Sequence, residues 1–208
     1  MAPNEALALL VLWSAPTSAR CPVAIWSSAE RRVRVIAGEA KGRRLVAPRG
    51  ATTRPATDRV RESIFGTLGS RCEGARALDL FAGSGALGVE ALSRGAASAT
   101  FVERDAAAVE AIRRNLATTG FGDRATIVRG DASAVLRVTT ERYELVFVDP
   151  PYADVELLVL LLAGPDLRRV AGGLVVVRVQ RRHAPPTPDQ WTIERERVVG
   201  DDVVLYLS

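Results

Sequence analysis

Residues 143–152 read Tyr-Glu-Leu-Val-Phe-Val-Asp-Pro-Pro-Tyr. The apolar run inside this stretch predicts a buried parallel strand that stops at Asp149. Two consecutive prolines cannot continue a sheet, because each lacks a backbone N–H and has its φ angle fixed at roughly −65°. The strand therefore ends by presenting the Asp149 carboxylate, the Pro150 carbonyl and the Tyr152 ring. In open α/β sheets, ligands bind at the edge formed by the carboxyl ends of the strands.

These three groups suit a planar ring that carries an exocyclic NH2. Such an amine is a poor nucleophile because its lone pair is delocalised into the ring. If Asp149 and the Pro150 carbonyl accept its two hydrogens, the nitrogen is pulled toward tetrahedral geometry and its lone pair can point at a methyl donor. Tyr152 could stack on a base that is flipped into this pocket. The alternative, in which the prolines only cap a strand, leaves the glycine motif upstream unexplained.

The region around this stretch alternates expected strands and helices with short connections, which predicts a right-handed, parallel, doubly wound sheet. We expect strands at 76–81, 98–103, 125–129, 143–149 and 173–180, and helices at 86–94, 105–118, 131–137 and 154–170. Residues 191–199 and 202–207 then predict an antiparallel hairpin. A parallel sheet that ends in such a hairpin is typical of the Rossmann-like class I methyltransferases. We therefore expect that α/β fold, with a seven-stranded, mostly parallel sheet.

A glycine motif, Asp79-Leu-Phe-Ala-Gly-Ser-Gly-Ala-Leu-Gly88, closes the first expected strand and opens a helix. Its glycines let a ligand press against the backbone, and the Asp79 carboxylate just before them can reach a cationic amino-acid group. Glu103, at the end of the second strand, can accept both hydroxyls of a ribose. Asp131, after the third strand, could accept from an adenine amine or simply cap the next helix, as we expect Asp105 to do. Together these positions indicate a nucleoside that carries an amino acid, and S-adenosylmethionine fits.

Charge is unevenly distributed along the chain. Residues 30–71 hold eleven Lys or Arg and four acidic residues, a balance of +7 in a chain whose net charge is +4. This block is a plausible footprint for a polyanion, the alternative being a solvated basic surface. Cys21 and Cys72 lack metal-type spacing, which argues against zinc and for a reducing compartment. No apolar run approaches the roughly 18–20 residues needed to span a bilayer. The single histidine, His183, lies in an expected loop and is interpreted as functionally silent.

The N-terminal third predicts two small elements. Basic and apolar residues alternate from Val33, and Gly38 and Gly42 bracket a turn, which favours a β-hairpin with arginines on its open face. A helix should begin at Thr57 or Asp58. Its residues divide into an apolar face (Val60, Ile64, Phe65 and Leu68) and a polar face (Arg59, Arg61 and Glu62). Residues 1–32 are interpreted as an extension, either disordered or non-native, with a docked helix or strand as the alternative.

The stretch from about Arg34 to Leu207 resembles the RsmD family, bacterial methyltransferases of a guanine N2 in small-subunit (16S) ribosomal RNA. The resemblance rests on Arg34-Val-Ile-Ala-Gly-Glu-Ala-Lys-Gly-Arg-Arg-Leu45, Arg54-Pro-Ala-Thr-Asp-Arg-Val-Arg-Glu-Ser-Ile-Phe65, the glycine motif and Phe147-Val-Asp-Pro-Pro-Tyr152. The glycine motif is common to many methyltransferases, and Asp-Pro-Pro-Tyr is shared with adenine N6 enzymes. The two N-terminal motifs are much more specific. Residues 1–32 have no family counterpart, and Ala56 replaces an expected polar residue.

The resemblance implies different roles for the two parts of the chain. Residues 33–71 would recognise RNA and close the cofactor pocket, and residues 72–208 would form the methyltransferase domain. Asp149, Pro150 and Tyr152 would hold the target base. The expected contacts to S-adenosylmethionine are Thr57, Asp79, Phe81, Gly83, Ser84, Gly85, Glu103, Arg104, Asp131 and Ala132, and the expected contacts to RNA are Arg34, Lys41, Arg43, Arg44, Arg54 and Arg59. The partner would be 16S rRNA in the assembling or assembled subunit, bound by a cytoplasmic monomer without metal or membrane attachment.

Two rival functions stay open on the residues alone. An adenine N6 methyltransferase would present the same groups to an NH2, although the chain lacks room for a large DNA-recognition domain. A non-catalytic RNA-binding assembly factor is the other rival, and the intact Asp149 and glycines argue against it. A nicotinamide dehydrogenase is disfavoured by the terminal hairpin and by the lack of an acid/base candidate for hydride transfer other than His183.

Overall fold

The computed structural model describes residues 33–48, 57–151, 154–185 and 187–208. Expectations for residues 1–32, for Arg54 and for Tyr152 lie outside these ranges. Contacts group Arg31–Ser208 into one compact unit. No helix in the described ranges is both long enough and apolar enough to cross a membrane.

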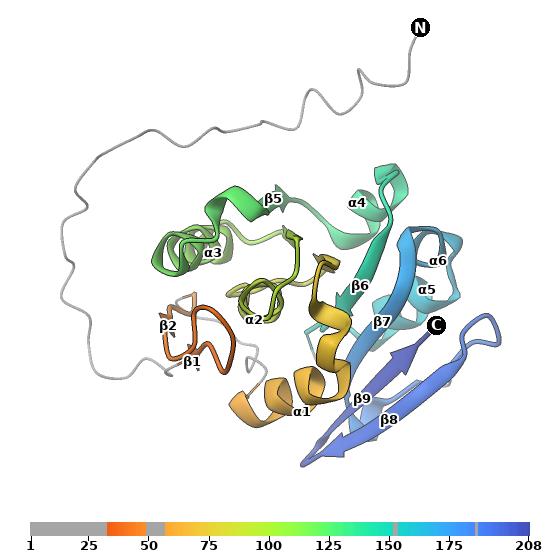
Figure 1. Ribbon diagram of the computed structural model, residues 1–208. Coiled ribbons are helices and arrows are strands. Elements are labelled where there is room, and N and C mark those ends of the chain that lie inside the picture. Colours follow the sequence, from red (N-terminus) through yellow and green to blue (C-terminus); the bar gives the residue numbers. More distant parts are fainter. Residues whose placement is uncertain (1–32, 49–56, 152–153, 186) are drawn as a thin grey trace, which may run out of the picture. The chain divides into compact units, whose positions relative to one another are not determined.

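A seven-stranded sheet of order β5-β4-β3-β6-β7-β9-β8 forms the centre of this unit (Figure 1). Five strands are parallel: β3 (Arg76–Asp79), β4 (Ser98–Glu103), β5 (Ala125–Arg129), β6 (Tyr143–Val148) and β7 (Ala171–Gln180). The last two, β8 (Ile193–Val199) and β9 (Asp202–Leu207), form the antiparallel hairpin. The predicted α/β fold is confirmed, including the terminal hairpin.

Helices cover both faces of the sheet because neighbouring residues of each buried strand point to opposite sides. Phe147 packs on one side with α1 (Asp58–Leu68), α2 (Ala86–Ser93) and α3 (Ala106–Thr119). Val146 packs on the other side with α4 (Ala132–Val138), α5 (Val155–Ala163) and α6 (Pro165–Val170). Short 3-10 turns, η1 (Gly69–Cys72), η2 (Gly122–Arg124) and η3 (Arg181–His183), complete the described elements.

The single helix expected over 154–170 is wrong, because the chain forms two helices there. Gly164 adopts an extended conformation with φ −77° and ψ 154°, and Pro165 begins α6. Proline has no backbone N–H to donate back to the preceding turn, so it suits the first position of a new helix.

The expected N-terminal hairpin is present as two short antiparallel strands, β1 (Val33–Arg34) and β2 (Arg44–Leu45). Gly38 and Gly42 both take φ +82° in the connecting segment. Thr57 caps α1, since its side chain accepts from the Val60 N–H. The placement of Arg61 on the polar face was wrong: only 1% of its surface is exposed.

Candidate active site

Two acidic residues meet at the point where the strand order reverses. Strand β3 lies between β4 and β6. From β3 the chain continues outward through β4 and β5 on one side, and it then returns to β6, which begins the other half of the sheet. Asp79 ends β3, and Asp149 follows the last residue of β6. The strands are in register there, with the Leu80 N–H donating to the Phe147 carbonyl at 3.1 Å. Such a switch point is where open α/β sheets bind ligands.

The glycine motif forms the turn between β3 and α2. Gly83 and Gly85 take φ values of +54° and +77°, a region that residues with side chains rarely occupy. Gly88 is needed for a different reason, because a Cβ atom there would lie 2.3 Å from the ring of Phe101. The motif thus leaves backbone exposed at the loop and packs α2 tightly on the sheet.

Asp79 is buried beneath this loop with half of its carboxylate unsatisfied. Oδ2 accepts from the Gly88 N–H at 3.2 Å, while Oδ1 has no hydrogen-bond partner among the described residues. Burial raises the pKa of Asp79 to about 7, against the lowering effect of the Gly88 N–H. A buried acceptor without a partner costs stability. A cationic amino group would satisfy it, so the site fits the amino-acid end of S-adenosylmethionine.

Other predicted cofactor residues lie along the same edge. Glu103 ends β4 and links the glycine loop to the start of α3. One of its oxygens accepts from the Gly83 N–H at 2.8 Å, and the other accepts from the Asp105 N–H at 2.9 Å. Asp131 caps α4 through the Ala134 N–H, so the capping alternative is present, while Asp105 is confirmed as the cap of α3.

The remaining predicted cofactor residues differ in exposure. Ala132 and Ser84 are buried, Phe81 and Thr57 are partly buried, and Arg104 is exposed beside Asp154 at 3.9 Å. Within the described ranges, no cluster of three or more potential metal ligands occurs.

The residues predicted to orient the base follow the end of β6. Asp149 and Pro150 lie at the carboxyl edge, next to the glycine loop, whereas Tyr152 lies outside the described ranges. Sequence reasoning missed the main partner of Asp149. Arg178 of β7 donates from Nη1 to both oxygens of that carboxylate, at 3.0 and 2.9 Å. The available signal was an arginine inside the otherwise apolar run 174–179.

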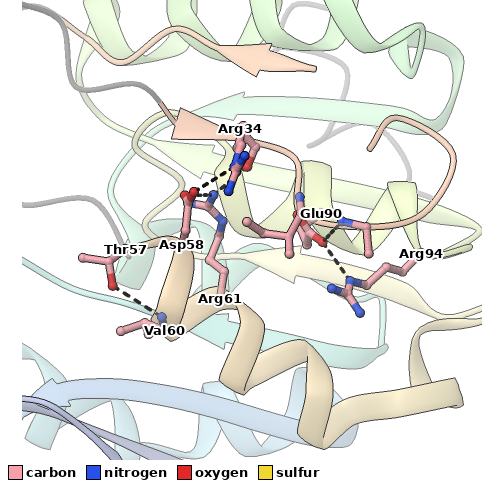
Figure 2. A network of polar contacts seen from close by, with 9 residues as sticks. Arg34, Thr57, Asp58, Val60, Arg61, Glu90 and Arg94 are labelled. Carbon is pink, nitrogen blue, oxygen red and sulfur yellow. Dashed lines mark hydrogen bonds and ion pairs between the residues drawn. The ribbon is translucent and has the colours of Figure 1, made fainter. Parts of the chain in front are cut away.

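The basic hairpin is held against α2 and α3 by two buried polar side chains that the sequence did not reveal. Glu90 of α2 accepts from the N–H groups of Ile36 and Ala37, at 2.7 and 3.0 Å, and pairs with Arg94 (Figure 2). Asn115 of α3 bonds both backbone groups of Val46 and the carbonyl of Ser84. The hairpin is therefore tied directly to the glycine loop and its helix.

The same close-up shows why Arg61 is buried. Its guanidinium lies under the hairpin, donating to the Arg34 carbonyl at 2.6 Å and to Asp58 at 2.9 Å (Figure 2). Arg34 also pairs with Asp58, at 3.1 Å. The other predicted RNA contacts within the described ranges are solvent-exposed, namely Lys41, Arg43, Arg44 and Arg59.

The seven-stranded order, the glycine loop after β3 and the terminal hairpin define a class I methyltransferase fold. A family model described as conserved hypothetical protein 95 matches residues 33–208. The chain belongs to this family, which is the RsmD family that the sequence resembled.

Relatives and solved structures agree with this assignment. The Bacillus subtilis (strain 168) protein YlbH is 46% identical over 180 residues, covering 84% of this chain and 98% of its own length. The ribosomal RNA small subunit methyltransferase D of Escherichia coli K12 is 39% identical, covering 83% of this chain and 88% of its own. The solved structure of Escherichia coli yhhF matches with a TM-score of 0.72 and 37% identity, over 85% of this chain and 98% of its own.

Proposed function

We propose that this chain transfers a methyl group from S-adenosylmethionine to the exocyclic N2 of a guanine in 16S ribosomal RNA. The observation that carries the proposal is the meeting of Asp79 and Asp149 at the switch point. Asp79 has one carboxylate oxygen without a hydrogen-bond partner among the described residues, which can accept from a cationic amino group. Asp149 begins the Asp-Pro-Pro sequence, which is suited to an amine. The ribosomal substrate is supported by relatives named for small-subunit rRNA methylation.

The chain's own residues act mainly by positioning. Asp79 would hold the amino-acid end of the cofactor, and Glu103 the ribose end. When bound, S-adenosylmethionine supplies a methyl group activated by its sulfonium. Asp149 and the Pro150 carbonyl would accept the two hydrogens of the base amine, which gains the methyl group and releases one proton. Correct placement of the reacting atoms alone is worth large rate factors.

The hairpin and α1 would bring the RNA to this edge. Their exposed basic side chains suit phosphate contacts, and we propose a monomer acting in the cytoplasm on the subunit during or after assembly. Because Glu90 and Asn115 tie the hairpin to α2, α3 and the glycine loop, RNA bound by the hairpin would lie at a fixed position relative to the cofactor site.

The test is methyl transfer from labelled S-adenosylmethionine to small subunits from cells lacking this enzyme, followed by mass analysis of the digested nucleosides. The proposal predicts N2-methylguanine at one position. N6-methyladenine would instead favour the adenine enzyme, and salt-sensitive binding without transfer would favour the assembly factor.

A further inference from the structure

A buried arginine lies at the proposed base site without a role in the function as described so far. Arg178 belongs to the run Leu174-Val-Val-Val-Arg-Val179 of the central strand β7. Strands β6 and β7 are parallel, with Val148 opposite Val177, so the next residues along, Asp149 and Arg178, lie side by side. An arginine is almost never fully buried unless its charge is paired.

Arg178 lies between two carboxylates. Its Nη1 is 3.0 and 2.9 Å from the oxygens of Asp149, and its Nε is 3.6 Å from Oδ2 of Asp202, the first residue of β9. Only 3% of the Arg178 side chain is exposed, against 17% for Asp149 and 14% for Asp202. Because a single nitrogen contacts both Asp149 oxygens, each oxygen keeps lone-pair capacity for a further donor.

We propose that Arg178 is a positioning residue, which keeps the Asp149 carboxylate ionised and fixes its orientation toward the target amine. This inference rests on the proposed function, because it concerns the carboxylate assigned to the base. An ionised carboxylate only accepts hydrogen bonds, whereas a protonated one carries an O–H donor that would oppose the amine.

The surroundings of Asp149 explain why such a partner is needed. Burial raises the pKa of Asp149, Arg178 lowers it, and the nearby carboxylate of Asp202 raises it further. Asp79 of β3 also lies close enough for its own pKa to be raised by the charge of Asp149. Among the described residues, Asp149 therefore has acidic neighbours on β3 and β9 and a cationic neighbour on β7.

Replacing Arg178 and replacing Asp202 should shift the pKa of Asp149 in opposite directions. Removal of the arginine charge in Arg178→Gln should raise the pKa of Asp149, because a close opposite charge favours the ionised carboxylate. Removal of the acidic neighbour in Asp202→Asn should lower it. The low-pH fall in methyl-transfer rate should move in the same directions, so that Arg178→Gln loses most activity at low pH and regains activity as the pH rises.

The experiment combines two readouts on folded variants. The 13Cγ signal of Asp149, assigned by its loss in Asp149→Asn, reports ionisation directly by NMR and needs neither cofactor nor activity. The pH profile of single-turnover transfer reports the same group in catalysis. Arg61→Gln is the matched control, since it removes another buried, Asp-paired arginine. It should lower stability but leave the Asp149 titration unchanged.

Unchanged Asp149 titration in Arg178→Gln would overturn the proposal, as would a rate loss in Arg178→Gln that is the same at every pH. If Arg178→Gln does not fold, the wild-type NMR titration still tests the proposal, because an Asp149 carboxyl that is protonated at the pH at which transfer is fastest would overturn it. If the wild type methylates no RNA, the proposed function fails, and the NMR titration then shows separately whether Arg178 sets the ionisation of Asp149.

Discussion

Asp79 is a single side chain whose surroundings disfavour its ionised form, and we propose that a bound cofactor relieves this. Its carboxylate is fully buried, accepts from the Gly88 N–H and lies near the charges of Asp149 and Glu103. Proteins retain such groups mainly at functional sites, where binding supplies the missing partner. Two predictions follow from its pKa of about 7.

The first concerns stability against pH. The pKa of Asp79 is about 7 in the folded protein and near its ordinary 3.8 when unfolded, so between these values the folded state binds an extra proton. Stability therefore falls as pH rises through this window and levels off above it, by about 4 kcal/mol at most. Asp79→Asn removes the ionisation. Chemical denaturation from pH 4 to 8 should therefore show the unfolding free energy of the variant rising relative to that of the wild type as the pH increases. Parallel curves would contradict this.

The second concerns the cofactor. A cationic amino group favours the ionised form of Asp79, so S-adenosylmethionine binding below pH 7 should release a proton and tighten as the pH rises. Calorimetry in two buffers of different ionisation enthalpy measures this release. Asp79→Asn should bind weakly with no proton release, and an unchanged affinity would rule out the assigned contact.

Single residues also mark the limit of what sequence can predict. Asp79, Asp105 and Asp149 each stand beside a recognisable local signal, a glycine motif, a helix start or a proline pair. Arg178 is marked only as an arginine in an apolar run, and Asn115 has no local signal. Neither pattern names the partner, because the partners lie 29 and up to 69 positions away and meet these residues only after the sheet and hairpin have formed.

At the scale of elements, the docking of the hairpin onto α2 depends on close backbone contact. Gly38 is so near α2 that a Cβ atom would lie 1.8 Å from the Ser93 carbonyl oxygen, while Gly42, with the same φ of +82°, has nothing within 4 Å. The Ala40 N–H and Ala37 carbonyl also bond the Ser93 hydroxyl, at 3.0 and 2.6 Å. The two glycines are therefore a matched pair.

Gly42→Ala should cost only backbone strain, about 1–2 kcal/mol of unfolding free energy. Gly38→Ala adds a backbone clash and should release the connecting segment from α2. Hydrogen exchange should then show faster exchange at the N–H groups of Ile36 and Ala37 in Gly38→Ala but not in Gly42→Ala. Equal effects of the two substitutions would show that the contact with Ser93 does not hold the hairpin.

Elements were predicted well where a local rule governs them and less well where packing does. The strands, the terminal hairpin and the Thr57 cap follow from period, prolines and capping residues. The break at Gly164 was missed because apolar residues continue on both sides of it, from Leu157 to Leu162 and again at Leu167 and Val170. Arg61 was assigned to the polar face because its residue type suggests exposure, yet the hairpin folds over it.

Across the whole molecule, positive and negative side chains are separated between the proposed RNA-binding hairpin and the proposed reaction site. The basic hairpin carries exposed arginines, while the switch point collects the carboxylates of Asp79, Glu103 and Asp149. A polyanion would be attracted to the first and excluded from the second, unless a neutral base alone enters. This arrangement suits a single flipped nucleotide from a bound RNA.

Salt dependence tests this division. Replacement of Arg43 and Arg44 by alanine should weaken subunit binding and reduce the slope of log affinity against log salt by about 0.7–0.9 for each lost phosphate contact. The control replaces Arg113 and Arg114 of α3, which are also exposed but lie beside Glu110. An equal change of slope in both pairs would mean that RNA binding does not depend on the hairpin.

The proposed reaction depends above all on the orientation of the amine by Asp149, and single-turnover methyl transfer by Asp149→Ala is the measurement that isolates this role. Cofactor affinity is measured on the same preparation to separate binding from chemistry. Transfer to the subunit should slow by about 100-fold or more, as for loss of one preorganised polar group, with S-adenosylmethionine still bound. Transfer at close to the wild-type rate would contradict this role.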